Sequence, residues 1–210
     1  ETEDSDAWRS YTRAFIAEFA ARGGDEYEAT VRDFASSENP DIAWRARRAL
    51  AARGLVDADA IEAWRSADGS GEAARMSVEA LASLPLEDAR SRAWESVYSE
   101  SLSNDFLTAT LAGLNASSWE GDSGLDSAVD RLRPYWEAHT IGMALRYANG
   151  VLAYGLDIDR EGSVERSVGL LRGWLDAHGD APAQLRRIVL EHLDAFERDE
   201  RVQRRWGSGQ

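Results

Sequence analysis

The stretch NPDIAWRARRALAARG, residues 39–54, shows in one segment why this chain is expected to fold as helices. Asn39 is a residue type that caps helix N-termini, and Pro40 suits the first helical position, where an N–H group has no partner within the helix. Gly54 is a typical residue just beyond a helix C-terminus. Between these signals the apolar residues recur every three or four positions: Ile42, Ala46, Ala49 and Leu50. The stretch is therefore predicted to form one amphipathic helix.

The same spacing of apolar residues continues along nearly the whole chain, and almost no stretch alternates at period two. Turn signals at residues 23–24, 68–71 and 121–124 separate the periodic segments. We therefore expect about ten helices of roughly 10 to 20 residues each. Pro134 lies inside the periodic segment that runs from Leu125 to Trp136, so a kink or a break is expected there. In the first helix the expected buried stripe is Trp8, Tyr11, Phe15 and Phe19.

The short connections between these helices predict the arrangement of the fold. Helices joined by a few residues pack as antiparallel hairpins, because a short loop leaves no other neighbour within reach. The tripeptide Ala-Trp-Arg recurs along the chain, but at unequal spacings that define no single period. The predicted fold class is all-α, a single helical-repeat domain over residues 1–210 built as an irregular superhelical stack of hairpins, similar to HEAT or armadillo repeats. A compact helical bundle is the alternative.

Composition narrows the partners that this chain is expected to have. The 38 acidic and 24 basic residues give a net charge of -14, which repels phosphate backbones and anionic lipids. No apolar run approaches the roughly 20 residues needed to span a bilayer, and the chain has no cysteine. We therefore expect no nucleic-acid partner, no membrane partner and a cytoplasmic location. The one feature that favours a nucleic-acid regulator is a local arginine face made by Arg45, Arg47 and Arg48.

The three histidines do not form a recognisable metal site. A zinc peptidase helix needs His-Glu-x-x-His, in which two imidazoles share one helix face and the glutamate activates water. His139, His178 and His192 all lack that context, and each is expected at a helix end or on the surface. For His178, which precedes a glycine, the last turn of a helix is the expected position.

Two loop-like segments imitate binding motifs. Residues 157–162 copy the front of an EF-hand loop, but Val168 stands where the bidentate glutamate would be needed, so an acidic turn is expected instead of a calcium site. Residues 69–74 resemble a dinucleotide fingerprint in letters only, because no strand precedes them, and a loop is expected. The sequence thus predicts no catalytic residue, metal or cofactor in this chain.

From about Arg45 to its end the chain resembles the C-terminal helical domain of a bacterial, actinobacterial-type aminopeptidase N, which is related to the corresponding domain of endoplasmic-reticulum aminopeptidases. The resemblance lies in the order of several short pieces along the chain. These are residues 49–56 (ALAARGLV), Ala93-Trp94, residues 102–104 (LSN), Gly113-Leu114, Pro134-Tyr135 and residues 180–191 (DAPAQLRRIVLE).

The resemblance implies that this chain is a C-terminal fragment of a larger zinc exopeptidase whose catalytic domain lies upstream. The zinc and the His-Glu-x-x-His motif would belong to that missing domain, and this fragment would not itself be an enzyme. In such enzymes the helical domain encloses the active site and restricts entry to peptides. The implied partners are therefore the upstream catalytic domain and peptide substrates. The alternative is a free-standing helical-repeat adaptor that binds a protein or peptide in its groove.

Four residues are candidates for contacts with a peptide or with a neighbouring domain. Trp119 and Trp206 each lie at the end of a helical pattern, where an exposed ring could belong to an interface. Arg186 and Arg187 could pair with a peptide carboxylate or with an acidic neighbour. The competing interpretation for the two arginines is a solvated helix surface.

Overall fold

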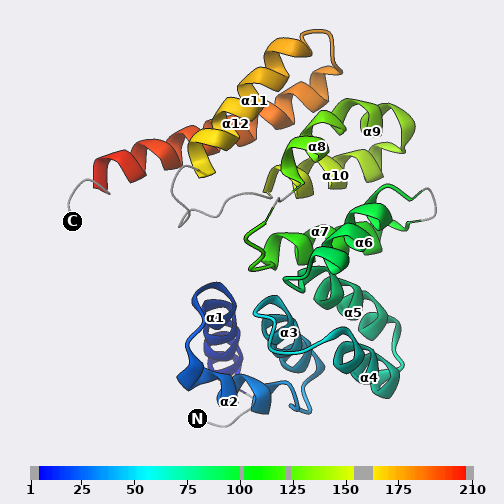
Figure 1. The fold of residues 1–210 in the computed structure, drawn as a ribbon, viewed down its shortest axis with the longest axis vertical. Helices are drawn as coiled ribbons and strands as arrows, with labels where there is room; N and C mark the ends of the chain where they lie inside the picture. Colours follow the sequence, from blue (N-terminus) through cyan, green and yellow to red (C-terminus); the bar gives the residue numbers. More distant parts are fainter. Residues whose placement is uncertain (1–4, 100–101, 122–123, 154–162, 207–210) are drawn as a thin grey trace. The chain divides into compact units, whose positions relative to one another are not determined.

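The computed structural model describes residues 5–99, 102–121, 124–153 and 163–206 of the chain (Figure 1). Within these ranges it contains 12 helices and no strand. The all-α fold class predicted from the apolar spacing is therefore confirmed. In the part of the chain that the structure covers, no helix combines the length and the apolar character needed to cross a membrane.

The chain divides into two compact units. Unit 1 is Glu1–Gly121 and unit 2 is Asp122–Gln210. The division falls in the glycine-rich turn that was predicted at residues 121–124.

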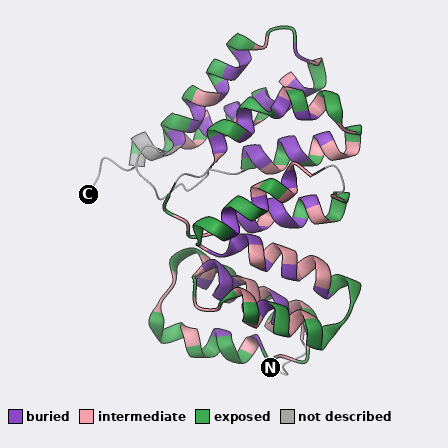
Figure 2. Cartoon of the chain, turned by 45° about the vertical axis from the view of Figure 1, so that its right-hand side comes forward, coloured by how far each residue is buried: buried purple, intermediate pink, exposed green. Residues whose placement is uncertain are grey.

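Unit 1 is built from hairpins, and its odd-numbered helices pack on one another in sequence. Its helices are α1 (Asp6–Arg22), α2 (Asp25–Phe34), α3 (Pro40–Ala52), α4 (Ala58–Asp68), α5 (Gly71–Ser83), α6 (Glu87–Val97) and α7 (Asn104–Ala116). Helix α1 packs on α3, α3 on α5 and α5 on α7, while α2, α4 and α6 pack on α3, α5 and α5 with α7 respectively. The apolar faces of these helices meet inside the unit, so the buried residues follow stripes along the ribbons (Figure 2).

Capping side chains explain where the helices of unit 1 begin. Ser5 accepts a hydrogen bond from the Trp8 N–H at 3.1 Å, and Asn39 accepts one from the Asp41 N–H at 3.1 Å. Asp57 caps α4 in the same way, accepting from the Ala60 N–H at 2.9 Å. These bonds satisfy N–H groups that have no partner inside the helix. The cap predicted at Asn39 is therefore confirmed.

The closest approach in unit 1 is made by α5 and α7 at Gly113. A Cβ atom added to Gly113 would overlap the Glu79 carbonyl oxygen and would lie 2.7 Å from the Ala82 Cβ. Only glycine permits this separation of the two helices.

The predicted stripe of α1 is wrong in one member, Tyr11. The buried residues of α1 are Thr12, Ile16 and Phe19, whereas Tyr11 is 73% exposed. Consecutive residues are about 100° apart around a helix. Since Thr12 faces the interior of the unit, the preceding residue points away from it.

Unit 2 consists of α8 (Leu125–Asp130), α9 (Leu132–Ala138), α10 (Ile141–Ala153), α11 (Ser163–Ala177) and α12 (Ala183–Trp206). Helix α10 packs on α8, α9 and α12, and α11 packs on α8 and α12. The break predicted near Pro134 is confirmed, since α8 ends at Asp130 and α9 begins at Leu132. Pro134 thereby lies in the first turn of α9, where the missing N–H removes no helical hydrogen bond.

Two stacked tyrosines hold the core of unit 2. Tyr135 of α9 lies parallel to Tyr147 of α10, with 3.9 Å between the ring centroids. The Tyr147 hydroxyl donates a hydrogen bond of 2.8 Å to the carbonyl oxygen of Ala128, and this joins α10 to α8. The hydrogen bond holds α8 against α10, and α8 also packs on α11.

Candidate functional site

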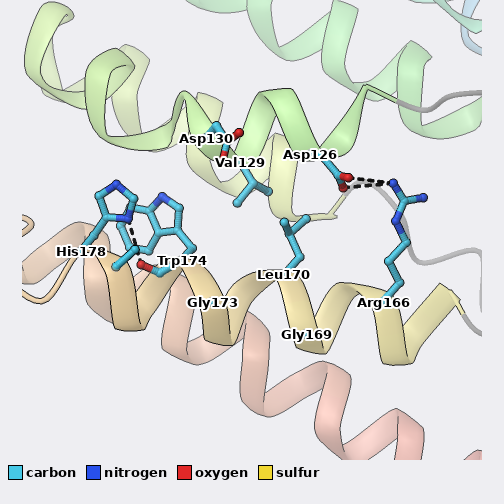
Figure 3. Close-up of a pocket in the computed structure, with 10 residues that line it drawn as sticks. Asp126, Val129, Asp130, Arg166, Gly169, Leu170, Gly173, Trp174 and His178 are labelled. Carbon is cyan, nitrogen blue, oxygen red and sulfur yellow. Dashed lines mark hydrogen bonds and ion pairs between the residues drawn. The ribbon is translucent and has the colours of Figure 1, made fainter.

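A groove with a volume of about 440 Å³ lies between α8 and α11 of unit 2 (Figure 3). Both walls belong to unit 2, so the groove is defined by this unit alone. Its lining residues are Asp126, Val129, Asp130, Arg166, Gly169, Leu170, Gly173, Trp174, Ala177 and His178.

The floor of the groove is apolar and unusually open along α11. Val129 and Leu170 point toward one another from the two helices (Figure 3). Gly169 and Gly173 lie one helical turn apart on α11, and a Cβ atom added to either would meet nothing within 4 Å. The α11 backbone is therefore accessible from the groove over a full turn.

The rim of the groove carries opposite charges in unequal number. Arg166 Nη2 donates to both carboxylate oxygens of Asp126, at 3.0 and 3.1 Å, across the two helices. Both side chains of this pair are more than half exposed, so the pair adds little to stability. Asp130, one turn further along α8, is exposed and pairs with no cation among the described residues. The rim thus keeps one uncompensated carboxylate.

Trp174 forms the end of the groove next to His178. Only 4% of Trp174 is exposed, and its Nε1 is buried without an acceptor among the described residues. Figure 3 shows the indole rising from α11 with its nitrogen directed to the side on which α8 lies. The His178 ring stacks on the indole with 4.6 Å between centroids, and its Nδ1 donates to the Trp174 carbonyl oxygen at 2.9 Å.

The same arrangement of aromatic ring and histidine closes α9. His139 stacks on Tyr135 with 3.8 Å between centroids, and its Nδ1 donates to the Tyr135 carbonyl oxygen at 3.0 Å. In both places the backbone N–H and the imidazole of the same histidine donate to one carbonyl of the last helical turn, at the end of the helix. The helix-end role predicted for His139 and His178 is therefore confirmed.

His192 lies within α12 and is partly buried. Its Nε2 is 3.4 Å from the Asn149 Oδ1 of α10. Burial lowers the pKa of His192 below its ordinary value, and the neighbouring Glu191 carboxylate opposes that shift only in part.

The structure gives the two candidate arginines different surroundings. Arg186 Nη1 donates to the carbonyl oxygens of Leu175 and His178, at 2.9 and 2.7 Å. It therefore caps the C-terminus of α11 from α12. Arg187, in contrast, is exposed and pairs with Glu191 one turn along α12 at 2.8 Å.

Of the two candidate tryptophans, the structure describes the side chain of Trp119 alone. Trp119 belongs to unit 1, where it is partly buried and its ring lies over Gly121. Trp206 is the last residue of α12, and its side chain lies outside what the structure describes.

The arginine face that favoured nucleic-acid binding is occupied by internal partners. Arg45 pairs with Asp41 at 2.9 Å, and Arg48 pairs with Glu79 at 2.6 Å. Arg47 lies over Trp44 and over Trp64, 4.9 and 5.3 Å from the ring centroids. Its Nε also donates to the carbonyl oxygen of Ala35 at 3.0 Å. The three guanidinium groups that would have to contact a phosphate backbone are therefore engaged with partners inside the unit.

The two segments that imitate binding motifs are residues 69–74 and 157–162. The loop predicted over residues 69–74 is right only for Gly69, which is in the left-handed region, and for Ser70, which caps α5. Residues 71–74 are wrong as a loop, because they form the first turn of α5. Residues 157–162, which copy the front of an EF-hand loop, lie outside the described residues. In the described part of the chain, no group of three or more His, Asp or Glu side chains is placed to hold a metal ion.

Sequence reasoning missed the α8–α11 groove. The available signal was the pair of glycines four residues apart in α11, inside an otherwise regular helical pattern. A scan against protein-family models and a search of curated proteins each found no match to this chain.

Proposed function

We propose that this chain is the non-catalytic C-terminal helical domain of a zinc aminopeptidase N, where it encloses the active site and controls which peptides enter. The observation that carries the proposal is the ordered resemblance from about Arg45 to the end of the chain. The resembling pieces coincide with structural landmarks: residues 49–56 span the end of α3, Pro134-Tyr135 opens α9, and residues 180–191 lead into α12.

The packing of unit 1 supports the role physically. Helices α1, α3, α5 and α7 each pack on the one before in the series. Because HEAT-like superhelices stack their helices in this way, we propose a HEAT-like superhelix as the more specific description of the fold. A stack of hairpins offers a long wall without an active site of its own. Such a wall can exclude folded proteins by size and can exclude water from a neighbouring reaction.

In the proposed parent enzyme, zinc bound by the upstream domain would polarise the scissile carbonyl and activate water. This chain would supply surfaces for the peptide and for the catalytic domain. The absence of cysteine suits a reducing compartment, so the cytoplasm is the proposed location.

The test compares three proteins: this chain alone, the chain with the coding region upstream of it, and the upstream region alone. Release of an amino acid from a chromogenic amide is expected from the second and third proteins and not from the first. Without this chain, the enzyme is expected to lose its discrimination between short peptides and a folded protein with an accessible N-terminus. Activity from this chain alone, or an upstream region without His-Glu-x-x-His, would contradict the proposal.

A second candidate is a free-standing adaptor that binds a protein or peptide. The observation that favours it is the α8–α11 groove, which is complete within unit 2. A gene that encodes only helical repeats, with no peptidase domain upstream, would support the adaptor and remove the first proposal.

A further inference from the structure

We propose that the groove between α8 and α11 binds a peptide segment that carries a basic side chain, with a backbone carbonyl of that segment accepting from Trp174 Nε1. The choice of a peptide as the occupant rests on the proposed function. The place of binding and the sign of the charge rest on the groove itself.

The Trp174 indole supplies the first argument. Its N–H is buried and has no acceptor among the described residues, although buried polar groups in folded proteins are almost always hydrogen-bonded. Trp174 lines the groove, and its nitrogen is directed to the side on which α8 lies (Figure 3). An acceptor that enters the groove would satisfy this donor. A peptide backbone provides such an acceptor at every residue.

The two glycines supply the second argument. Glycine inside a helix is less stable than alanine, so two of them one turn apart on the same face need a reason. At Gly113 the reason is a neighbouring backbone, but at Gly169 and Gly173 nothing within 4 Å of an added Cβ explains the residue. The open turn of α11 leaves room for the main chain of a bound segment to approach closely.

The charges on the rim decide the chemistry of the occupant. Four titratable side chains line the groove: Asp126, Asp130, Arg166 and His178. Arg166 compensates Asp126, and the His178 ring is engaged at the Trp174 carbonyl. Asp130 remains and would repel an acidic segment. A lysine or arginine of the bound segment can pair with it.

The experiment titrates the whole 210-residue chain with two blocked peptides, acetyl-Ala-Ala-Arg-Ala-Ala-amide and its glutamate counterpart. The indole N–H resonances are followed by NMR, and that of Trp174 is assigned from its loss in Trp174→Phe. The arginine peptide is expected to move the Trp174 resonance downfield in a saturable way. The glutamate peptide is expected to bind about tenfold more weakly, because it meets Asp130 instead of pairing with it.

Two variants and one control localise the binding. Gly173→Leu fills the open turn and is expected to abolish the shift, while Gly71→Leu, at another open glycine, leaves it unchanged. Asp130→Asn changes a single exposed group and is expected to weaken binding of the arginine peptide by about threefold to fivefold. Circular dichroism verifies that each variant is folded.

The inference fails if the Trp174 resonance does not respond to the arginine peptide, if both peptides bind equally, or if folded Gly173→Leu binds as well as the unchanged chain. Its failure is separate from failure of the proposed function. The aminopeptidase assay on the longer protein does not depend on this groove, and a functional parent enzyme with a silent Trp174 resonance would overturn the inference alone.

Discussion

Replacing Gly113 by alanine is expected to destabilise unit 1, although alanine is the better helix former. Gly113 of α7 lies against α5, where an added Cβ would overlap the Glu79 carbonyl oxygen and lie 2.7 Å from the Ala82 Cβ. A backbone carbonyl cannot rotate away as a side chain can. The two helices must therefore move apart, and the contacts around them loosen.

The size of the effect follows from two opposing contributions. Alanine gains about 1 kcal/mol over glycine from helix propensity. Overpacking a well-filled contact usually costs about 1–3 kcal/mol, and a clash with a backbone atom places Gly113→Ala at or above the upper end. The net expectation is a loss of about 2 kcal/mol in the free energy of unfolding of unit 1.

Gly173→Ala is the matched comparison, since its Cβ would meet nothing within 4 Å. Only the propensity contribution remains, so this change is expected to stabilise unit 2 by about 0.5–1 kcal/mol. Urea unfolding followed by far-ultraviolet circular dichroism measures both effects, with separate transitions fitted for the two units where they are resolved. If Gly113→Ala proved as stable as the unchanged chain, or if both substitutions shifted stability in the same direction, the packing argument would be wrong.

Three further predictions use the same urea assay. Glu79→Ala removes the partner of Arg48, whose ion pair of 2.6 Å has side chains only 28% and 12% exposed, and is expected to cost about 1–3 kcal/mol; an unchanged midpoint would show that the pair is not stabilising. Arg186→Ala uncaps α11 at two carbonyls and is expected to cost about 1–3 kcal/mol, whereas Arg187→Ala leaves the midpoint unchanged; equal effects would contradict the assigned cap. Burial lowers the pKa of His192 in the folded chain, so the unfolded chain binds a proton at this residue more tightly. The free energy of unfolding is therefore expected to fall as the pH falls from about 6.5 through the folded pKa of His192, and His192→Gln should flatten that decline.

Much of the fold could be predicted from the sequence because helix ends are local. Ser5, Asn39 and Asp57 cap their helices through hydrogen bonds to backbone groups two or three residues away. The break before Pro134 is equally local, since proline affects only its own turn and the preceding one. The histidine caps at His139 and His178 were expected at helix ends for the same reason. Their stacking on Tyr135 and Trp174 was not expected.

The candidate site was the part that sequence reasoning did not find. Arg186 and Arg187 look equivalent as adjacent letters, yet one caps α11 and the other pairs along its own helix. Which of two neighbours faces another helix depends on the rotation of α12. That rotation is set by packing against α10 and α11. The groove likewise depends on the separation of α8 from α11.

The sequence by itself determined that this chain is helical, where most helices begin and end, and which residues are available to be buried, because these properties depend on neighbours within one or two turns. The tertiary structure alone decided that Tyr11 is exposed, that Gly113 joins two helices closely while Gly173 faces open space, and that Trp174 keeps a buried N–H without a partner among the described residues. The physical reason is that burial and hydrogen-bond partnership across helices depend on distances between segments far apart in the chain, and local propensity carries no information about those distances.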